Sequence, residues 1–162
     1  LGRIMEAMEE MGREMPVIFP VHPQTRGMLG KSPSPRPSPV KGEGGNFLIN
    51  PLGYLDFLKL MAHARVVLTD SGGIQEETTI LKVPCLTLRE NTERPITVEM
   101  GTNRLVGSDP ARILENWQEI MRAGNPSASQ TPPLWDGRAA ERIAGILASG
   151  IWKVRAKKTA GQ

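Results

Sequence analysis

The residues best suited to chemistry lie in the stretch "LTDSGGIQEET", residues 68 to 78. An apolar run, residues 66–68, ends at Thr69 and Asp70, and Ser-Gly-Gly then begins what we expect to be a helix. A strand that turns directly into a helix places the turn at the carboxyl edge of a parallel sheet, where ligands bind in such folds. Two glycines there leave the main-chain N–H groups of the helix start open to an anion such as a phosphate.

Ser71 can cap this helix or donate its hydroxyl to the same phosphate, although a plain turn and cap explains Ser-Gly-Gly equally well. Glu76 and Glu77 follow on the helix, about 100° apart around its axis, so we expect one to face the cleft and the other to meet solvent. A carboxylate can accept two hydrogen bonds from a vicinal diol such as a ribose. Glycines for phosphate and an acid for a diol together indicate a nucleotide site that differs from the G-x-G-x-x-G dinucleotide pattern.

Short apolar runs alternate with helical patterns along the chain and would position this turn. We expect helices over residues 3–15, 53–64, 72–81, 93–100, 110–122 and 138–149, and strands over residues 16–22, 47–51, 65–70, 83–88 and 103–107. This order predicts an α/β fold, a Rossmann-like parallel sheet with helices on both faces, spanning residues 1–150. The last two helices each carry one apolar face and are expected to close the domain.

Two segments stand apart from this alternation. Residues 30–45 hold four prolines and four glycines without an apolar period, so we expect a flexible excursion that is either an insertion or a replacement. Residues 151–162 form a basic tail, and the basic run within it lacks interleaved aromatic residues, so no nucleic-acid partner is expected.

Length and composition limit the remaining classes. The 162 residues suffice for one domain with a core, and no apolar stretch reaches the roughly 18 residues that a membrane span needs. The N-terminus lacks the order of a secretory signal, so we expect a cytoplasmic protein without a membrane partner. Cys85 is the only cysteine and is most simply a small buried residue. The sequence shows no metal-binding cluster, and no cofactor is expected.

Two long stretches, "YLDFLKLMAHARVVLTDSGGIQEE" and "VPCLTLRENTERPITVEMGTNRLVG", resemble the C-terminal half of non-hydrolysing UDP-N-acetylglucosamine 2-epimerases. The resemblance runs from about residue 3 to residue 149, interrupted by the Pro-rich segment. It implies the second domain of a two-domain glycosyltransferase-B arrangement, in which UDP-sugar binds between two Rossmann-like domains. The family interconverts UDP-N-acetylglucosamine and UDP-N-acetylmannosamine by eliminating UDP to give a 2-acetamidoglucal and adding UDP back.

The resemblance also implies roles for individual residues. The diphosphate would be held by Ser71, Gly72, Gly73 and Arg94, and the uridine ribose by Glu77. Phe57 would lie beside the uracil, although its helical spacing with apolar neighbours also suits a core residue. His22 matches a position near a second, regulatory UDP-sugar site, although a lone histidine at a strand end is usually structural.

The departures from the family bear on activity. The family's acid and base groups near C2 of the sugar come from the first domain, and an "HRxEN"-like element precedes the helix with which this chain begins. We therefore expect a fragment, the nucleotide-binding half, without epimerase activity of its own, and a homodimer for the complete enzyme. Two alternatives stay open: a glycosyltransferase-B transferase domain, which "TERPxxxxxGTN" disfavours, and a non-catalytic nucleotide-binding module. Surface polysaccharide precursors are the family's usual destination.

Overall fold

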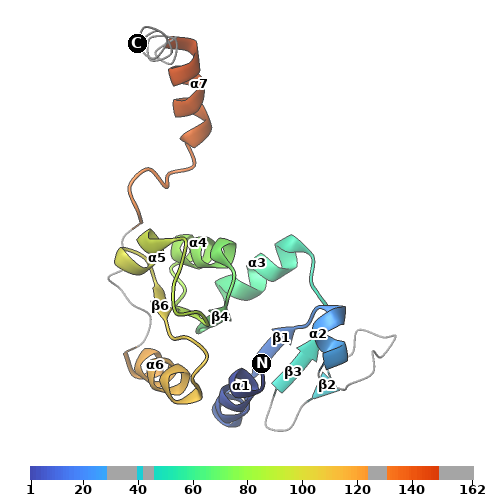
Figure 1. Cartoon of the computed structure of the whole chain (residues 1–162). Helices are drawn as coiled ribbons and strands as arrows, with labels where there is room; N and C mark the ends of the chain where they lie inside the picture. Colours follow the sequence, from blue (N-terminus) through green and yellow to red (C-terminus); the bar gives the residue numbers. More distant parts are fainter. Residues whose placement is uncertain (29–39, 42–45, 124–130, 150–162) are drawn as a thin grey trace, which may run out of the picture.

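The computed structural model of the chain describes residues 1–28, 40–41, 46–123 and 131–149, in which helices alternate with short strands (Figure 1). The elements in chain order are α1 Gly2–Glu14, β1 Val17–Pro20, α2 Pro23–Met28, β2 Val40–Lys41, β3 Asn46–Ile49, α3 Tyr54–Ala62, β4 Val67–Thr69, α4 Gly72–Leu81, β5 Cys85–Thr87, α5 Pro95–Glu99, β6 Asn103–Leu105, α6 Pro110–Ala123 and α7 Ala139–Ser149. Every helix and strand expected from the apolar periodicity is present, with small shifts at the ends.

The strands form two sheets of three strands each. One sheet has the order β4-β5-β6 and is parallel throughout, with Leu86 of β5 opposite Leu68 and Arg104. The other has the order β1-β3-β2, with β1 parallel and β2 antiparallel to β3. Parallel pairs joined through helices confirm the expected Rossmann-like α/β class. The expected single sheet is in two parts, because no strand ladder joins β1 to β4 within the described residues.

Two short elements were not predicted from the sequence. Helix α2 begins with Pro23 at its first position, where the missing N–H costs nothing, and the Arg26 N–H donates to the His22 carbonyl at 3.0 Å. Strand β2 lies inside the Pro/Gly-rich segment 30–45 and pairs with the edge of β3 through its main chain. The remainder of that segment, residues 30–39 and 42–45, and the basic tail 151–162 lie outside the described residues.

The main core lies between the β4-β5-β6 sheet and the helices α1 and α6. Its buried side chains are Ala7, Met11, Leu86, Val106, Ile113, Trp117 and Ile120. Ile113, Trp117 and Ile120 recur at intervals of four and three residues, which aligns them on one face of α6. Cys85 is fully buried on β5, as expected for a small residue of the interior. This packing fixes the sheet that carries the turn between β4 and α4.

Helix α7 does not close the domain, and the expectation that it would is wrong. Figure 1 shows α7 lying away from both sheets, and none of its side chains is buried. Ile143 and Leu147, two residues of the predicted apolar face, are 57% and 60% exposed. The helix forms because its residues favour helix and because Arg138 forms an ion pair with Glu141 in its first turn, whereas an apolar face by itself does not specify what it packs against.

Candidate functional site

The turn between β4 and α4 lies at the carboxyl end of β4, as expected. Thr69 is the last residue of β4 and lies opposite Thr87 of β5. Ser71 then forms the N-cap of α4 with extended main-chain angles (φ −85°, ψ 127°), and its N–H donates to the Thr69 Oγ1 at 3.0 Å. The Ser71 side chain makes no capping bond. The first N–H groups of α4 therefore lack a side-chain acceptor, which suits the end of the helix to an anion.

The two glycines of this turn are not needed to avoid a steric clash. A Cβ on Gly72 would lie 3.6 Å from the Cγ of Arg94, and a Cβ on Gly73 would lie 3.8 Å from the Ser71 Oγ, both ordinary contacts. Neither glycine has a positive φ. The fold would accept alanine at both positions, so the turn-and-cap explanation accounts poorly for two consecutive glycines. Their small size leaves the N-terminus of α4 open.

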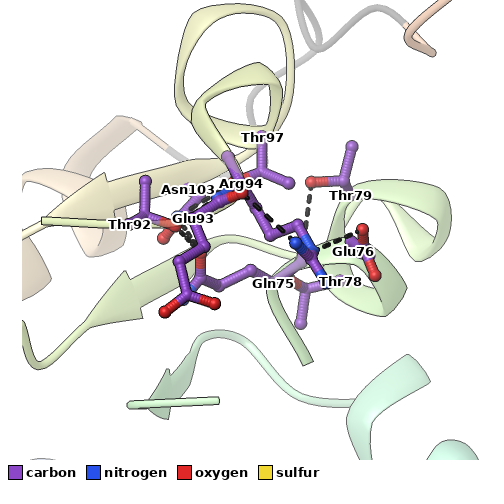
Figure 2. Close-up of polar contacts among 9 residues, drawn as sticks. All are labelled: Gln75, Glu76, Thr78, Thr79, Thr92, Glu93, Arg94, Thr97 and Asn103. Atoms are coloured by element: carbon purple, nitrogen blue, oxygen red, sulfur yellow. Dashed lines mark hydrogen bonds and ion pairs between the residues drawn. The ribbon is translucent and has the colours of Figure 1, made fainter. Parts of the chain in front are cut away.

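Arg94 lies beside this open helix end. It forms the N-cap of α5, and its Nε is 2.8 Å from the Oε1 of Glu76 on α4 (Figure 2). Both side chains are about two-fifths exposed, at 43% and 41%. An ion pair this exposed contributes only about 0 to 1 kcal/mol, so an anionic ligand can replace Glu76 at little cost. Glu76 thus faces Arg94, although we expected one of the two glutamates to meet solvent.

Glu77 faces a different neighbour, the side chain of Tyr54 on α3. A hydrogen bond with the Glu77 carboxylate, together with its negative charge, raises the pKa of Tyr54. The two residues belong to a shallow hollow between α3 and α4 that Trp135 also borders. The hollow is lined by Tyr54, Leu58, Glu76, Glu77, Ile80, Leu81 and Trp135. An aromatic ring and a carboxylate are therefore adjacent at this place.

Two of the predicted residues lie apart from the others. Phe57 is half-buried on α3 and does not line the hollow, which instead contains Tyr54 and Leu58 of the same helix. His22 is exposed between β1 and α2, and its Nδ1 accepts the Gln24 N–H at 3.4 Å. The structure thus brings together the glycine turn, Arg94 and the two glutamates. His22 lies elsewhere, just after β1, a strand of the other sheet.

Comparison with known proteins identifies the family. The family model described as UDP-N-acetylglucosamine 2-epimerase matches residues 1–148. The chain belongs to this family. A UDP-N-acetylglucosamine 2-epimerase from Methanocaldococcus jannaschii is 44% identical over 134 residues, and one from Methanococcus maripaludis is 40% identical over 152 residues. These matches cover 83% and 91% of this chain. The chain spans only 35% and 39% of the lengths of these relatives.

A solved structure of the M. jannaschii epimerase, in complex with UDP-N-acetylglucosamine and UDP, is similar with a TM-score of 0.75 and 37% identity. The similarity covers 92% of this chain and 40% of that protein. The fold of this chain therefore corresponds to one part of a UDP-N-acetylglucosamine 2-epimerase, which agrees with the expected second domain of a glycosyltransferase-B arrangement.

Sequence analysis missed a group of buried polar residues in this epimerase-family chain. Gln75, Thr78 and Thr79 form the buried face of α4, and Gln75 contacts Thr92 and Asn103 (Figure 2). The signal was present in the sequence, because a glutamine shares the i, i+3, i+4 face of a short helix with two threonines and no leucine or isoleucine. Among the described residues, no group of three His, Cys, Asp or Glu could hold a metal ion, and no helix is long and apolar enough to cross a bilayer.

Proposed function

We propose that the chain is the UDP-binding part of a UDP-N-acetylglucosamine 2-epimerase. The observation that carries this proposal is the position of Arg94 beside the open N-terminus of α4, where its guanidinium Nε lies 3.9 Å from the place of a Cβ on Gly72. In the proposal Ser71, Gly72, Gly73 and Arg94 bind the diphosphate, because main-chain N–H groups and a guanidinium are both suited to phosphate oxygens.

The other groups complete a nucleotide site. Glu77 accepts the ribose hydroxyls, Phe57 keeps its proposed place beside the uracil, and Tyr54, adjacent to Glu77, supplies an aromatic ring on the same side of the site. His22 keeps its proposed role at a second UDP-sugar site. A solved relative, the M. jannaschii epimerase, carries UDP-N-acetylglucosamine and UDP in its complex, which supports UDP-sugar as the ligand class.

The proposed contribution of this chain to the reaction is charge stabilisation. When the bond between C1 of the sugar and the phosphate oxygen breaks, the electron pair stays on the UDP oxygen, and the proton on C2 passes to a base. Arg94 and the positive end of α4 stabilise the charge on the departing UDP. Glu77 is assigned to the ribose, and the family resemblance places the acid and base groups in the first domain, so in the proposal the base and acid at C2 come from outside this chain. A homodimer of the complete enzyme and a cytoplasmic location remain predictions.

Calorimetric titration of the folded chain with UDP tests the proposal. We expect a dissociation constant of about 1 mM, a binding free energy of about −4 kcal/mol, because this chain supplies one of the two walls of the cleft. Arg94→Gln weakens this binding, whereas Arg89→Gln, which removes the same charge from an exposed position of the same loop, leaves it unchanged. An absence of heat at several times this concentration, with circular dichroism confirming a folded chain, contradicts the proposal.

A further inference from the structure

The main chain of Arg94 is held on both sides by threonine hydroxyls. The Arg94 N–H donates to the Oγ1 of Thr92 at 2.9 Å. The Arg94 carbonyl accepts from the Oγ1 of Thr97 at 2.7 Å and from the Thr97 N–H at 3.0 Å. The backbone of this arginine is therefore fixed, while its side chain remains 43% exposed in its ion pair with Glu76.

Both threonines are linked by hydrogen bonds to Gln75 of α4, Thr92 directly and Thr97 through Asn103 (Figure 2). The Thr92 hydroxyl donates to the Gln75 Oε1 at 2.5 Å. The Asn103 Nδ2 donates to the same oxygen at 3.2 Å and to the Thr97 Oγ1 at 3.1 Å. Each threonine hydroxyl thus donates one bond and accepts one, so the direction of every bond in this network is determined.

The Gln75 side chain is the point where the network meets the helix of the candidate site. Gln75 is 1% exposed and lies three residues after Gly72, on the inner face of α4. Loss of this buried amide oxygen removes the acceptor of two donors, on Thr92 and Asn103. The loop before α5 must then shift, and Arg94 shifts with it.

We propose that Gln75 is a positioning residue that holds Arg94 beside the N-terminus of α4, so that its guanidinium meets the diphosphate of the ligand. The inference rests on the proposed function. It adds that the geometry between the glycine turn and its cation depends on one buried amide oxygen, which a hydrophobic residue of similar size cannot supply.

The test compares UDP with uridine, which lacks the phosphates that Arg94 would contact. NMR titrations measure the affinity of each ligand for the unchanged chain and for Gln75→Leu. We expect Gln75→Leu to weaken UDP binding about tenfold, equivalent to about 1.4 kcal/mol, and to leave the affinity for uridine unchanged. Without any ligand, we also expect the NMR signal of the Arg94 main-chain N–H in Gln75→Leu to differ from that in the unchanged chain. Equal losses for UDP and uridine, or no loss for either, overturn the inference.

Substitutions at Thr92 keep the inference testable if Gln75→Leu does not fold. Thr92→Val removes the hydroxyl while keeping the shape, and we expect the same selective loss for UDP; Thr92→Ser restores the hydroxyl and the affinity. The matched control is Thr79→Val on α4, whose buried hydroxyl donates to the Gln75 main-chain carbonyl and not to the side chain. A selective loss for UDP in this control overturns the inference. If the unchanged chain binds uridine but not UDP, the proposed function fails first and the role of Gln75 falls with it.

Discussion

Arg94, at the start of α5, and Glu76 of α4 form an ion pair in the candidate site, with Nε and Oε1 separated by 2.8 Å. The cation that best suits a diphosphate is therefore already paired with a carboxylate of α4, the helix whose N-terminus binds the diphosphate in the proposed function. Because both side chains are substantially exposed, the pair is weak, and in the proposed function UDP competes with Glu76 for the guanidinium.

The two neighbouring glutamates should consequently respond in opposite directions. Glu76→Gln removes the competing carboxylate, and we expect UDP affinity to rise about threefold, the scale of an exposed ion pair. Glu77→Gln removes the proposed acceptor of the ribose hydroxyls and lowers the affinity. Calorimetry at fixed ionic strength measures both. Equal losses in the two variants would show that the glutamates are assigned wrongly.

Alanine at the glycines of the turn should separate stability from binding. Because a Cβ fits at Gly72 and Gly73, we expect Gly73→Ala to raise the free energy of unfolding by about 0.5 kcal/mol, as glycine in a helix costs backbone entropy. For alanine at either glycine, the free energy of UDP binding should become less favourable by roughly 1 kcal/mol, since a methyl group covers the N–H groups of the helix start.

Gly2→Ala is the matched control for Gly72→Ala, since both glycines occupy the first position of a helix and have room for a Cβ. Thermal unfolding and UDP titration of the two variants are compared. An unchanged UDP affinity in Gly72→Ala would favour the simple turn-and-cap explanation of Ser-Gly-Gly.

The contrast between α6 and α7 can be measured by urea unfolding. Trp117 of α6 is almost fully buried, so Trp117→Ala should lower the free energy of unfolding by about 3 to 5 kcal/mol. Ile143→Ala on α7 should change it by less than about 0.5 kcal/mol, because that side chain is exposed. A cost above about 2 kcal/mol for Ile143→Ala would show that α7 packs on the domain in solution.

Cys85 should be unreactive in the folded chain. Burial raises the pKa of its thiol to about 11, despite hydrogen bonds to Thr78 and Thr87 that act in the opposite direction. Thiolate is the reactive form, so a disulfide reagent at pH 8 should label Cys85 only after unfolding. The folded state favours the protonated thiol, so this group contributes stability below the thiol pKa of the unfolded chain, about 8.5, and loses it as the pH rises toward 11. Rapid labelling of the folded chain at pH 8 would contradict this burial.

The purified chain should not exchange the C2 hydrogen of UDP-N-acetylglucosamine. One general acid or base contributes about 10² to 10⁴ in rate, and in the proposed function both the base and the acid at C2 come from outside this chain. NMR of the sugar in deuterated water checks this. Deuterium entry above a buffer control, abolished by one carboxylate substitution in this chain, would place the catalytic base within these residues.

The sequence determined the local structure and the place of the turn that carries the candidate site. Apolar periodicity predicted the helices and strands, since period 3.6 and short continuous runs reflect which side of each element is buried. The turn at residues 71–73 had to lie at the carboxyl end of β4, because a parallel strand followed directly by a helix has no other arrangement. These inferences depend only on residues close in the chain.

Only the tertiary structure decided which distant side chains meet. Sequence spacing separates Glu76 from Glu77 around the helix axis, but packing of α5 and α3 against α4 selects Arg94 for one and Tyr54 for the other. The connection of Gln75 to Thr92 and Asn103 likewise joins residues 17 and 28 positions apart. The apolar face of α7 gives the complementary case, because amphipathic periodicity indicates a surface that can be buried, while the partner that buries it is determined by contacts between elements.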